Sequence, residues 1–268
     1  MIIDTHCHLD DGRFEGDLDD VVKRAKNAEV SGILIPGADI FDLPKAKEIS
    51  YKYDNIFYAA GVHPYHHKDY NESILEEYLQ DWRCIAVGEC GLDYFRLPKN
   101  EEEKTKEKVA QKEVFIAQIK LAAKFAKPLI VHVRDANEDS FDILNEYAVS
   151  TGVTGVLHCY NASTLLLKLR ENFYFALGGV LTFQNAKNLT EILPEIPKER
   201  LLFETDAPYL TPHPHRGERN EPAYTRYVVQ KAGEILNISV EELSKLSSNN
   251  AKRIFKAFNK ANSDRIMG

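Results

Sequence analysis

The stretch KVAQKEVFIAQIKLAAKFAKPLIVHVR, residues 108–134, contains a helical pattern followed at once by a strand pattern. The mostly apolar run at 128–134 reads as a short, buried strand. A helix that leads directly into such a strand is typical of the repeating unit of a parallel sheet. The apolar positions expected on one face of the helix are Val109, Phe115, Ile119, Ala123 and Ala126.

The same alternation of strand and helix continues along the whole chain. Eight strands in 268 residues match the roughly 250 residues of an eight-fold (β/α)8 barrel of the TIM type. The competing architecture is a doubly wound open sheet, but no G-x-G-x-x-G motif follows the first strand. The predicted strands are 1–8, 32–37, 56–63, 84–89, 128–134, 154–160, 173–179 and 201–206.

The C-terminal part of the chain continues beyond the eighth strand. Residues 223–237 read as the last helix of the barrel, and 240–258 as an extra helical segment that closes its bottom or flank. No linker rich in Pro or Ser and no shift of composition divides the chain. We therefore expect a single domain, 1–268.

Composition excludes several classes of protein. The chain has 41 Asp and Glu and 34 Lys and Arg, which gives a net charge of −7. This charge disfavours a broad basic face that binds nucleic acid. It still allows a grip on a few phosphates. No apolar run approaches the roughly 18–20 residues of a membrane helix, and the start of the chain lacks a signal-peptide pattern. Four scattered cysteines indicate reduced thiols. We expect a cytoplasmic protein without membrane association or an obligate protein partner.

Polar residues gather where the predicted strands end. The carboxyl ends of the strands form the face on which barrel enzymes build their sites. Because side chains alternate along a strand, His6 and His8 should share a face with Ile2 and Asp4. The same rule points Cys7, Cys90 and Cys159 away from the site. The strand-end residues are His6, His8, His63, Glu89, His132, His158 and Asp206.

This convergence indicates a metal site. A lone H-x-H pair or a single strand-end histidine is more often a satisfied polar residue. Several imidazoles and carboxylates buried together would be costly without a compensating charge. Two divalent cations provide that charge, because such ligands suit them and one carboxylate can bridge both ions. A thiolate site is disfavoured, since no C-x-x-C pair occurs.

At this point the motifs resemble a known family, the TatD family of metal-dependent deoxyribonucleases, within the amidohydrolase-like barrels. The matches follow the family's order and span essentially the whole chain. They are D-T-H-C-H-L-D at 4–10, G-V-H-P at 61–64, V-G-E-C-G-L-D-Y at 87–94, H-V-R at 132–134, L-H-C-Y at 157–160, E-T-D-A-P-Y-L at 204–210 and R-G-E-R-N-E-P at 216–222.

The resemblance implies a role for each strand-end residue. His6, His8 and Asp206 would hold one metal ion, His132 and His158 the other, and Glu89 would bridge both. His63 and Arg134 would meet substrate phosphate, and we expect Arg216 and Arg219 near the mouth to do the same. Glu204 shares a strand face with Asp206, so it would either stand behind a ligand and hold a histidine tautomer or be a buried structural carboxylate. The two ions would be Mg, Mn or Zn, since histidine ligands favour zinc or manganese while the family is described as magnesium- or manganese-dependent.

We therefore expect a metal-dependent deoxyribonuclease in which Asp206 and Glu89 are catalytic. It would hydrolyse phosphodiester bonds of DNA, or also RNA, from single-stranded or frayed ends. One alternative is an ester or amide hydrolase acting on a small molecule or aminoacyl-tRNA, because metal-activated water also attacks carbonyls. The other is a non-enzymatic binding protein. The arginines favour a phosphate-bearing substrate, and the full ligand set disfavours the binding protein.

Overall fold

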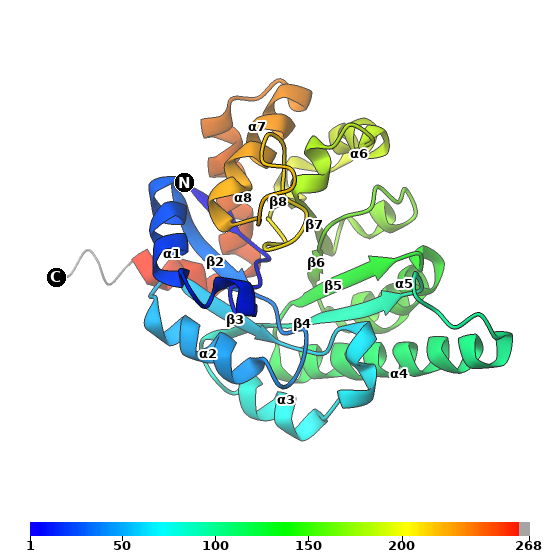
Figure 1. Cartoon of the computed structure of the whole chain (residues 1–268). Helices are drawn as coiled ribbons and strands as arrows, with labels where there is room; N and C mark the ends of the chain where they lie inside the picture. Colours follow the sequence, from blue (N-terminus) through cyan, green and yellow to red (C-terminus); the bar gives the residue numbers. More distant parts are fainter. Residues whose placement is uncertain (263–268) are drawn as a thin grey trace.

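The computed structural model describes residues 1–262, and its core is one sheet of eight parallel strands in the order β1 to β8. Helices surround this sheet on the outside (Figure 1). All eight predicted strands are confirmed, with regular ends shifted by a few residues. The strands are β1 (Ile2–Asp4), β2 (Val30–Ile35), β3 (Ile56–Ala60), β4 (Cys84–Asp93), β5 (Leu129–Arg134), β6 (Gly155–Leu157), β7 (Phe173–Leu177) and β8 (Leu201–Phe203).

The helices alternate with the strands as the sequence pattern predicts. The α-helices are α1 (Leu18–Asn27), α2 (Leu43–Lys52), α3 (Glu72–Leu79), α4 (Glu101–Phe125), α5 (Asn137–Ile143), α6 (Lys187–Ile192), α7 (Thr225–Leu236) and α8 (Val240–Ile254). Shorter helical segments are η1 (Gly12–Phe14), η2 (Pro64–Asp69), η3 (Leu144–Ala148), η4 (Val149–Thr151), η5 (Leu166–Leu169), η6 (Gly179–Thr182), η7 (Leu193–Glu195), η8 (Lys198–Arg200), η9 (Pro222–Tyr224) and η10 (Lys256–Asn262).

The barrel closes between its first and last strands. Thr5 N donates to the carbonyl of Phe203 at 3.2 Å, and Asp206 N donates to the carbonyl of His6 at 2.9 Å. Cys7 and Ala207 then form a parallel bridge just past the regular strands. The two chain segments that carry the first and last site residues are therefore held side by side by backbone hydrogen bonds.

Two apolar cores lie on the two sides of the sheet. The larger core fills the layer between sheet and helices, and the smaller one fills the barrel interior. The interior core takes residues such as Ile3, Ile130 and Leu202 from the strands, together with Phe255 and Phe258 from the C-terminal segment. The extra helical segment thus closes the barrel bottom, as its position in the sequence predicts.

The face of α4 that packs on the barrel differs from the one expected. Phe115 and Ile119 are buried, but Val109 is 48% exposed and Ala123 is also exposed. The buried face includes two glutamines instead. Gln118 exchanges two hydrogen bonds with the backbone of Val62, and Gln111 does the same with Asp93. Polar side chains occupy this face because the strand ends beside it expose unpaired backbone groups.

The regular alternation along the first strand stops at Asp4. Ile2 packs in the outer core and Ile3 in the interior. The prediction that Ile2 shares a face with His6 is therefore wrong. The chain leaves the strand at Asp4, whose carboxylate accepts a hydrogen bond from the Thr205 hydroxyl at 2.6 Å. Cys7 and Cys90 do face the outer core as expected, whereas Cys159 is half-buried.

No helix within residues 1–262 is long and apolar enough to cross a bilayer.

Candidate metal centre

The strand-end residues meet at the carboxyl end of the barrel. Glu89 and His132 belong to the long strands β4 and β5, whereas the remaining residues follow directly after their strands. Asp206 and Cys159 have left-handed backbone conformations (φ 56° and 42°), which turn the chain at these ends. The structure therefore brings together side chains from six of the eight strands.

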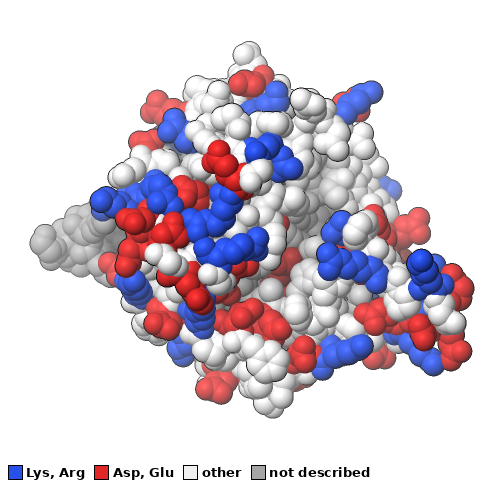
Figure 2. Space-filling model, in the orientation of Figure 1, with Lys and Arg blue, Asp and Glu red and all other residues white. Residues whose placement is uncertain are grey.

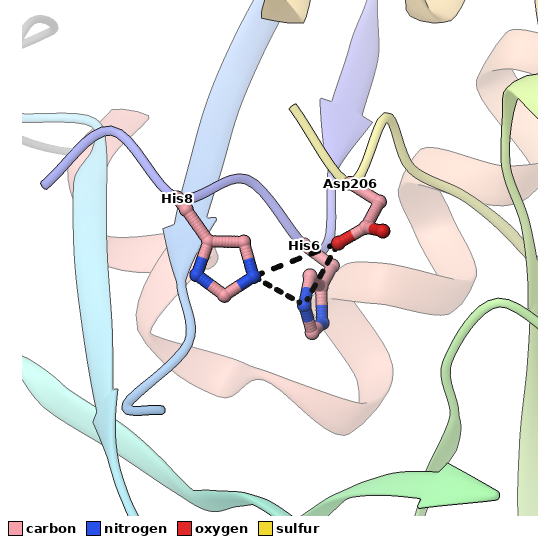
Figure 3. A group of neighbouring side chains, drawn as sticks. All are labelled: His6, His8 and Asp206. Atoms are coloured by element: carbon pink, nitrogen blue, oxygen red, sulfur yellow. Dashed lines mark hydrogen bonds and ion pairs between the residues drawn. The ribbon is translucent and has the colours of Figure 1, made fainter. Parts of the chain in front are cut away.

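One group of three ligand atoms lies between the first and last strands. The Nε2 atoms of His6 and His8 each lie 3.5 Å from Oδ1 of Asp206 and 3.3 Å from each other. Figure 3 shows the two imidazoles, which follow β1, turned toward the carboxylate that follows β8. These atoms could hold one metal ion.

Glu89 lies between this group and a second one. Its Oε1 is 2.9 Å from Nδ1 of His132 and 3.0 Å from Nε2 of His158. Its Oε2 points the other way, 3.3 Å from Nε2 of His6. The two oxygens of a single carboxylate thus face two different histidine pairs.

Glycines place Glu89 in this position. Gly88 and Gly91 have φ of +135° and +143°, which only glycine adopts readily. A Cβ on Gly88 would lie 2.4 Å from the carbonyl oxygen of Ile130. The register of β4 against β5 shifts between Val87 and Cys90, and such a bulge re-aims a side chain. The V-G-E-C-G motif therefore describes a bulged strand that turns Glu89 toward the barrel axis.

Further carboxylates hold the histidines from behind. Asp93 Oδ2 is 2.9 Å from Nε2 of His132, and Glu204 Oε1 is 3.3 Å from Nδ1 of His158. Such partners fix the orientation and tautomer of a ligand imidazole. Glu204 therefore lies behind an imidazole of the cluster, and its role in fixing a tautomer stays a prediction. Asp93 has no role in the sequence analysis, although its place on the same strand four residues beyond Glu89 is a usable signal.

Asp4 is a second residue to which the sequence analysis assigns no role. Its carboxylate also accepts hydrogen bonds from the backbone N–H groups of Thr205 and His6, so it ties the ends of the first and last strands together. Burial raises the pKa of Asp4 to about 8, because it outweighs the hydrogen bond from Thr205, which lowers the pKa. Asp4 is a structural tie beneath the ligands.

The electrostatics of the cluster follow from burial and from its opposing charges. Burial alone would raise the pKa of Glu89, but the neighbouring His158 and His6 hold it well below its usual range. Burial lowers the pKa of His63 to about 3, so this imidazole is neutral. Its Nδ1 accepts a hydrogen bond from Tyr65 N at 3.1 Å, which leaves Nε2 to face Glu89. Burial raises the pKa of the Cys7 and Cys90 thiols, which argues against thiolate ligands.

The donor set fits divalent cations. Among residues 1–262, Glu89, Asp93, Glu204 and Asp206 form ion pairs only with histidines, and with no Lys or Arg. Buried carboxylates need a compensating positive charge. Imidazole nitrogens and carboxylate oxygens are ligands that zinc and manganese accept.

The residues expected to bind phosphate differ in their exposure and in the groups that they already contact. His63 lies within the cluster, its ring centroid 4.4 Å from that of His132. Arg134 is exposed at the end of β5, and Arg216 is exposed in the loop after β8, where it donates to the Thr211 carbonyl. Arg219 instead forms a two-pronged ion pair with Asp17, at 2.8 and 2.7 Å. Figure 2 shows basic side chains on both sides of the central hollow.

The eight-stranded parallel barrel with this cluster at its carboxyl end is that of a metal-dependent hydrolase. The chain is a member of the TatD family, since the family model described as "TatD related DNase" matches residues 3–256.

Individual relatives cover nearly the whole chain. The uncharacterized metal-dependent hydrolase YabD of Bacillus subtilis is 40% identical over 96% of this chain and 99% of its own length. A protein of Erwinia tasmaniensis named 3'-5' ssDNA/RNA exonuclease TatD is 32% identical over 95% and 99%. The crystal structure of the TatD homologue YJJV from Escherichia coli K12 matches with a TM-score of 0.83 at 26% identity, covering 95% of this chain and 98% of that one.

Proposed function

We propose that this chain is a two-metal phosphodiesterase that removes nucleotides from single-stranded or frayed ends of DNA, and also of RNA. The observation that carries this proposal is the position of Glu89, with one carboxylate oxygen toward His6 and the other toward His132 and His158. A carboxylate that faces two ligand groups suits a pair of ions better than a single one.

In this proposal the ligands divide as the geometry divides them. His6, His8 and Asp206 would hold one ion, His132 and His158 would hold the other, and Glu89 would be a ligand of both. Zn, Mn or Mg would lower the pKa of bound water and stabilise the negative charge on phosphate oxygens. The protein itself contributes the orientation of the ligands, through Asp93 behind His132 and Glu204 behind His158.

Asp206 is the best candidate for the residue that takes a proton from the attacking water. Only its Oδ1 is paired with the two histidines, and within residues 1–262 its Oδ2 forms no hydrogen bond or ion pair. The pKa of Asp206 stays below its usual value, since histidine contacts outweigh burial, so this oxygen is ionised and able to orient water.

Substrate phosphate would be bound beside the metal centre by His63, Arg134 and Arg216. The neutral imidazole of His63 presents Nε2 toward the cluster, and a guanidinium suits phosphate oxygens because it donates in a planar fork. Arg219 is the weakest candidate for a phosphate contact, because a phosphate would compete there with Asp17. The Erwinia relative is named as an exonuclease of single-stranded DNA and RNA, which supports a single-stranded substrate of either kind.

One assay separates this function from its main alternative. Metal-loaded protein is incubated with single-stranded DNA, single-stranded RNA and a generic carboxylic ester, each with and without chelator. We expect chelator-sensitive release of nucleotides and no ester hydrolysis. Ester hydrolysis without nucleotide release would replace the proposal by an esterase or amidase acting through the same residues.

A salt series tests how much of the strand is bound. The net charge of −7 repels a polyanion, so binding depends on the metals and a few arginines. We expect a plot of log affinity against log salt concentration to fall with a slope that corresponds to roughly two to four bound phosphates, each contributing about −0.7. Closed circular duplex should be cut poorly. Efficient internal cutting of the circle, or a slope for about eight phosphates, would require an extended binding track.

A further inference from the structure

An exposed aromatic ring and an unpaired arginine lie together beside the metal centre. Phe95 is 55% exposed, and the guanidinium carbon of Arg134 lies 3.6 Å from the centroid of its ring. Within residues 1–262 this guanidinium makes no hydrogen bond and no ion pair. A large apolar ring left open to solvent beside a free positive charge calls for a ligand with both a flat face and a negative charge.

The local structure holds both side chains next to the ligands. Arg134 ends β5 two residues after His132, and its carbonyl accepts a hydrogen bond from Tyr94 N at 2.9 Å. Phe95 N donates to Oδ1 of Asp93 at 2.9 Å, while the other oxygen of Asp93 contacts His132. The same carboxylate therefore positions a metal ligand and the backbone of the aromatic residue.

We propose that Phe95 and Arg134 form a nucleotide-binding subsite, in which the ring stacks on a base of the substrate strand and the guanidinium binds an adjacent phosphate. This inference rests on the proposed function and names its substrate more closely, as a strand whose bases are unpaired. Base-on-ring stacking tolerates any sequence because every base has a flat face. A base inside an intact duplex has no free face, so the subsite selects single-stranded or frayed ends.

The opposite end of the barrel offers a matched control. Trp82 is 57% exposed just before β4, and the guanidinium carbon of Arg83 lies 4.6 Å from the centroid of its ring. Arg83, however, is only 7% exposed and donates to the carbonyl of Ile56 at 3.2 Å. That pair is used by the fold, and it lies at the amino ends of the strands, away from the ligands.

The experiment compares two strands of equal length, a short oligodeoxyadenylate and the same backbone with abasic sites in place of its bases. Binding to the metal-loaded protein is measured by fluorescence anisotropy, and cleavage by product release. For Phe95→Ala we expect affinity for the base-bearing strand to fall roughly 5- to 150-fold, the range for losing one stacked base. Affinity for the abasic strand should hardly change. Phe95→Leu, which keeps an apolar side chain, should show the same selective loss if Phe95→Ala does not fold.

Arg134→Ala should weaken the binding of both strands. It should also make the slope of log affinity against log salt concentration shallower by about 0.7, the contribution of one phosphate. Trp82→Ala should bind both strands as the wild type does. The subsite would be overturned if Phe95→Ala lost as much affinity for the abasic strand as for the base-bearing one. It would also be overturned if Phe95→Leu lost no affinity, or if Trp82→Ala lost as much affinity as Phe95→Ala. Cleavage of the abasic strand reports on the phosphodiesterase itself. If neither strand is cleaved, the proposed function fails, and the selective effect on binding still decides the subsite.

Discussion

The two ends of the barrel are built from the same strands but carry opposite chemistry. At the amino end, Phe255 and Phe258 fill the interior, and Asn250 donates to the carbonyls of Lys198 and Leu201. At the carboxyl end, histidines and carboxylates occupy the corresponding space. One end lowers its free energy by burying apolar surface, whereas the other buries charges that need metal ions to balance them.

The comparison teaches that similar contacts serve different purposes at the two ends. Arg83 at the amino end is buried, and its Nη1 donates to the backbone carbonyl of Ile56, so its contact with Trp82 belongs to the fold. Arg134 at the carboxyl end contacts Phe95, and its guanidinium forms no hydrogen bond or ion pair with any other group in residues 1–262. What an arginine already binds decides whether it can bind a ligand. Variants at the two ends should accordingly change different measurements.

The largest effect should come from Glu89→Ala. Losing the carboxylate between the two histidine groups should release both ions, and turnover should fall about 10³- to 10⁴-fold or more because the stabilisation worth several kcal/mol is lost. Metal analysis of the dialysed variant measures the loss. Two ions retained per chain would remove Glu89 from the bridging role.

Asp206→Asn should separate metal binding from catalysis. The remaining ligands keep metal in place, whereas the amide cannot take up a proton, so turnover should fall about 10²- to 10⁴-fold. Thermal unfolding and metal content should stay close to those of the wild type. Near-normal nuclease activity at saturating metal would show that another group takes the proton.

Phe255→Ala should weaken the amino end without touching the site. Phe255 is buried in the interior core, and truncation of such a phenylalanine costs about 3–5 kcal/mol of unfolding free energy. Urea unfolding measures the change, and activity per folded molecule at low temperature serves as the control. A loss of metal affinity in the folded variant would mean that the two ends are coupled.

Cys90→Ala should have a smaller effect of the same kind, although Cys90 follows Glu89 directly. Its side chain faces the outer core, so its loss should cost about 1 kcal/mol in packing and leave metal content unchanged. The same holds for Cys7→Ala. A variant that loses metal would show that a thiol contributes to the site.

Arg219→Ala should have the smallest effect. Its pair with Asp17 is partly exposed, so it contributes less than about 1 kcal/mol. The hydrogen bond from Arg219 lowers the pKa of Asp17 to about 2, which means that the pair stabilises the fold above the unfolded pKa of about 3.9. The difference from wild type should therefore be constant from about pH 7 to pH 5 and shrink as pH falls through about 2. Urea unfolding over this range checks it, and a changed salt slope for strand binding would return Arg219 to the phosphate contacts.

The succession of strands and helices was predictable because it depends on local spacing. Eight apolar runs and the helical segments between them are each visible within a few residues of sequence. The face of α4 was not, because Gln111 and Gln118 are buried to satisfy backbone groups of residues far along the chain. The break of alternation after Asp4 was not predictable either, since Asp4 accepts a hydrogen bond from Thr205, which follows the last strand 201 residues further along the chain.

By itself, the sequence determined the eight βα units, the parallel order that follows from short crossovers, and the gathering of His6, Glu89, His132 and Asp206 at strand ends. These follow from local patterns and from the rule that parallel strands end on one face. Only the tertiary structure decided that the two oxygens of Glu89 face different histidines and that Asp93 stands behind His132. It also decided that, in the described part of the chain, Arg134 has no ion pair while Arg219 is paired with Asp17. Those contacts join residues distant in the chain, and their geometry is settled only when the barrel closes.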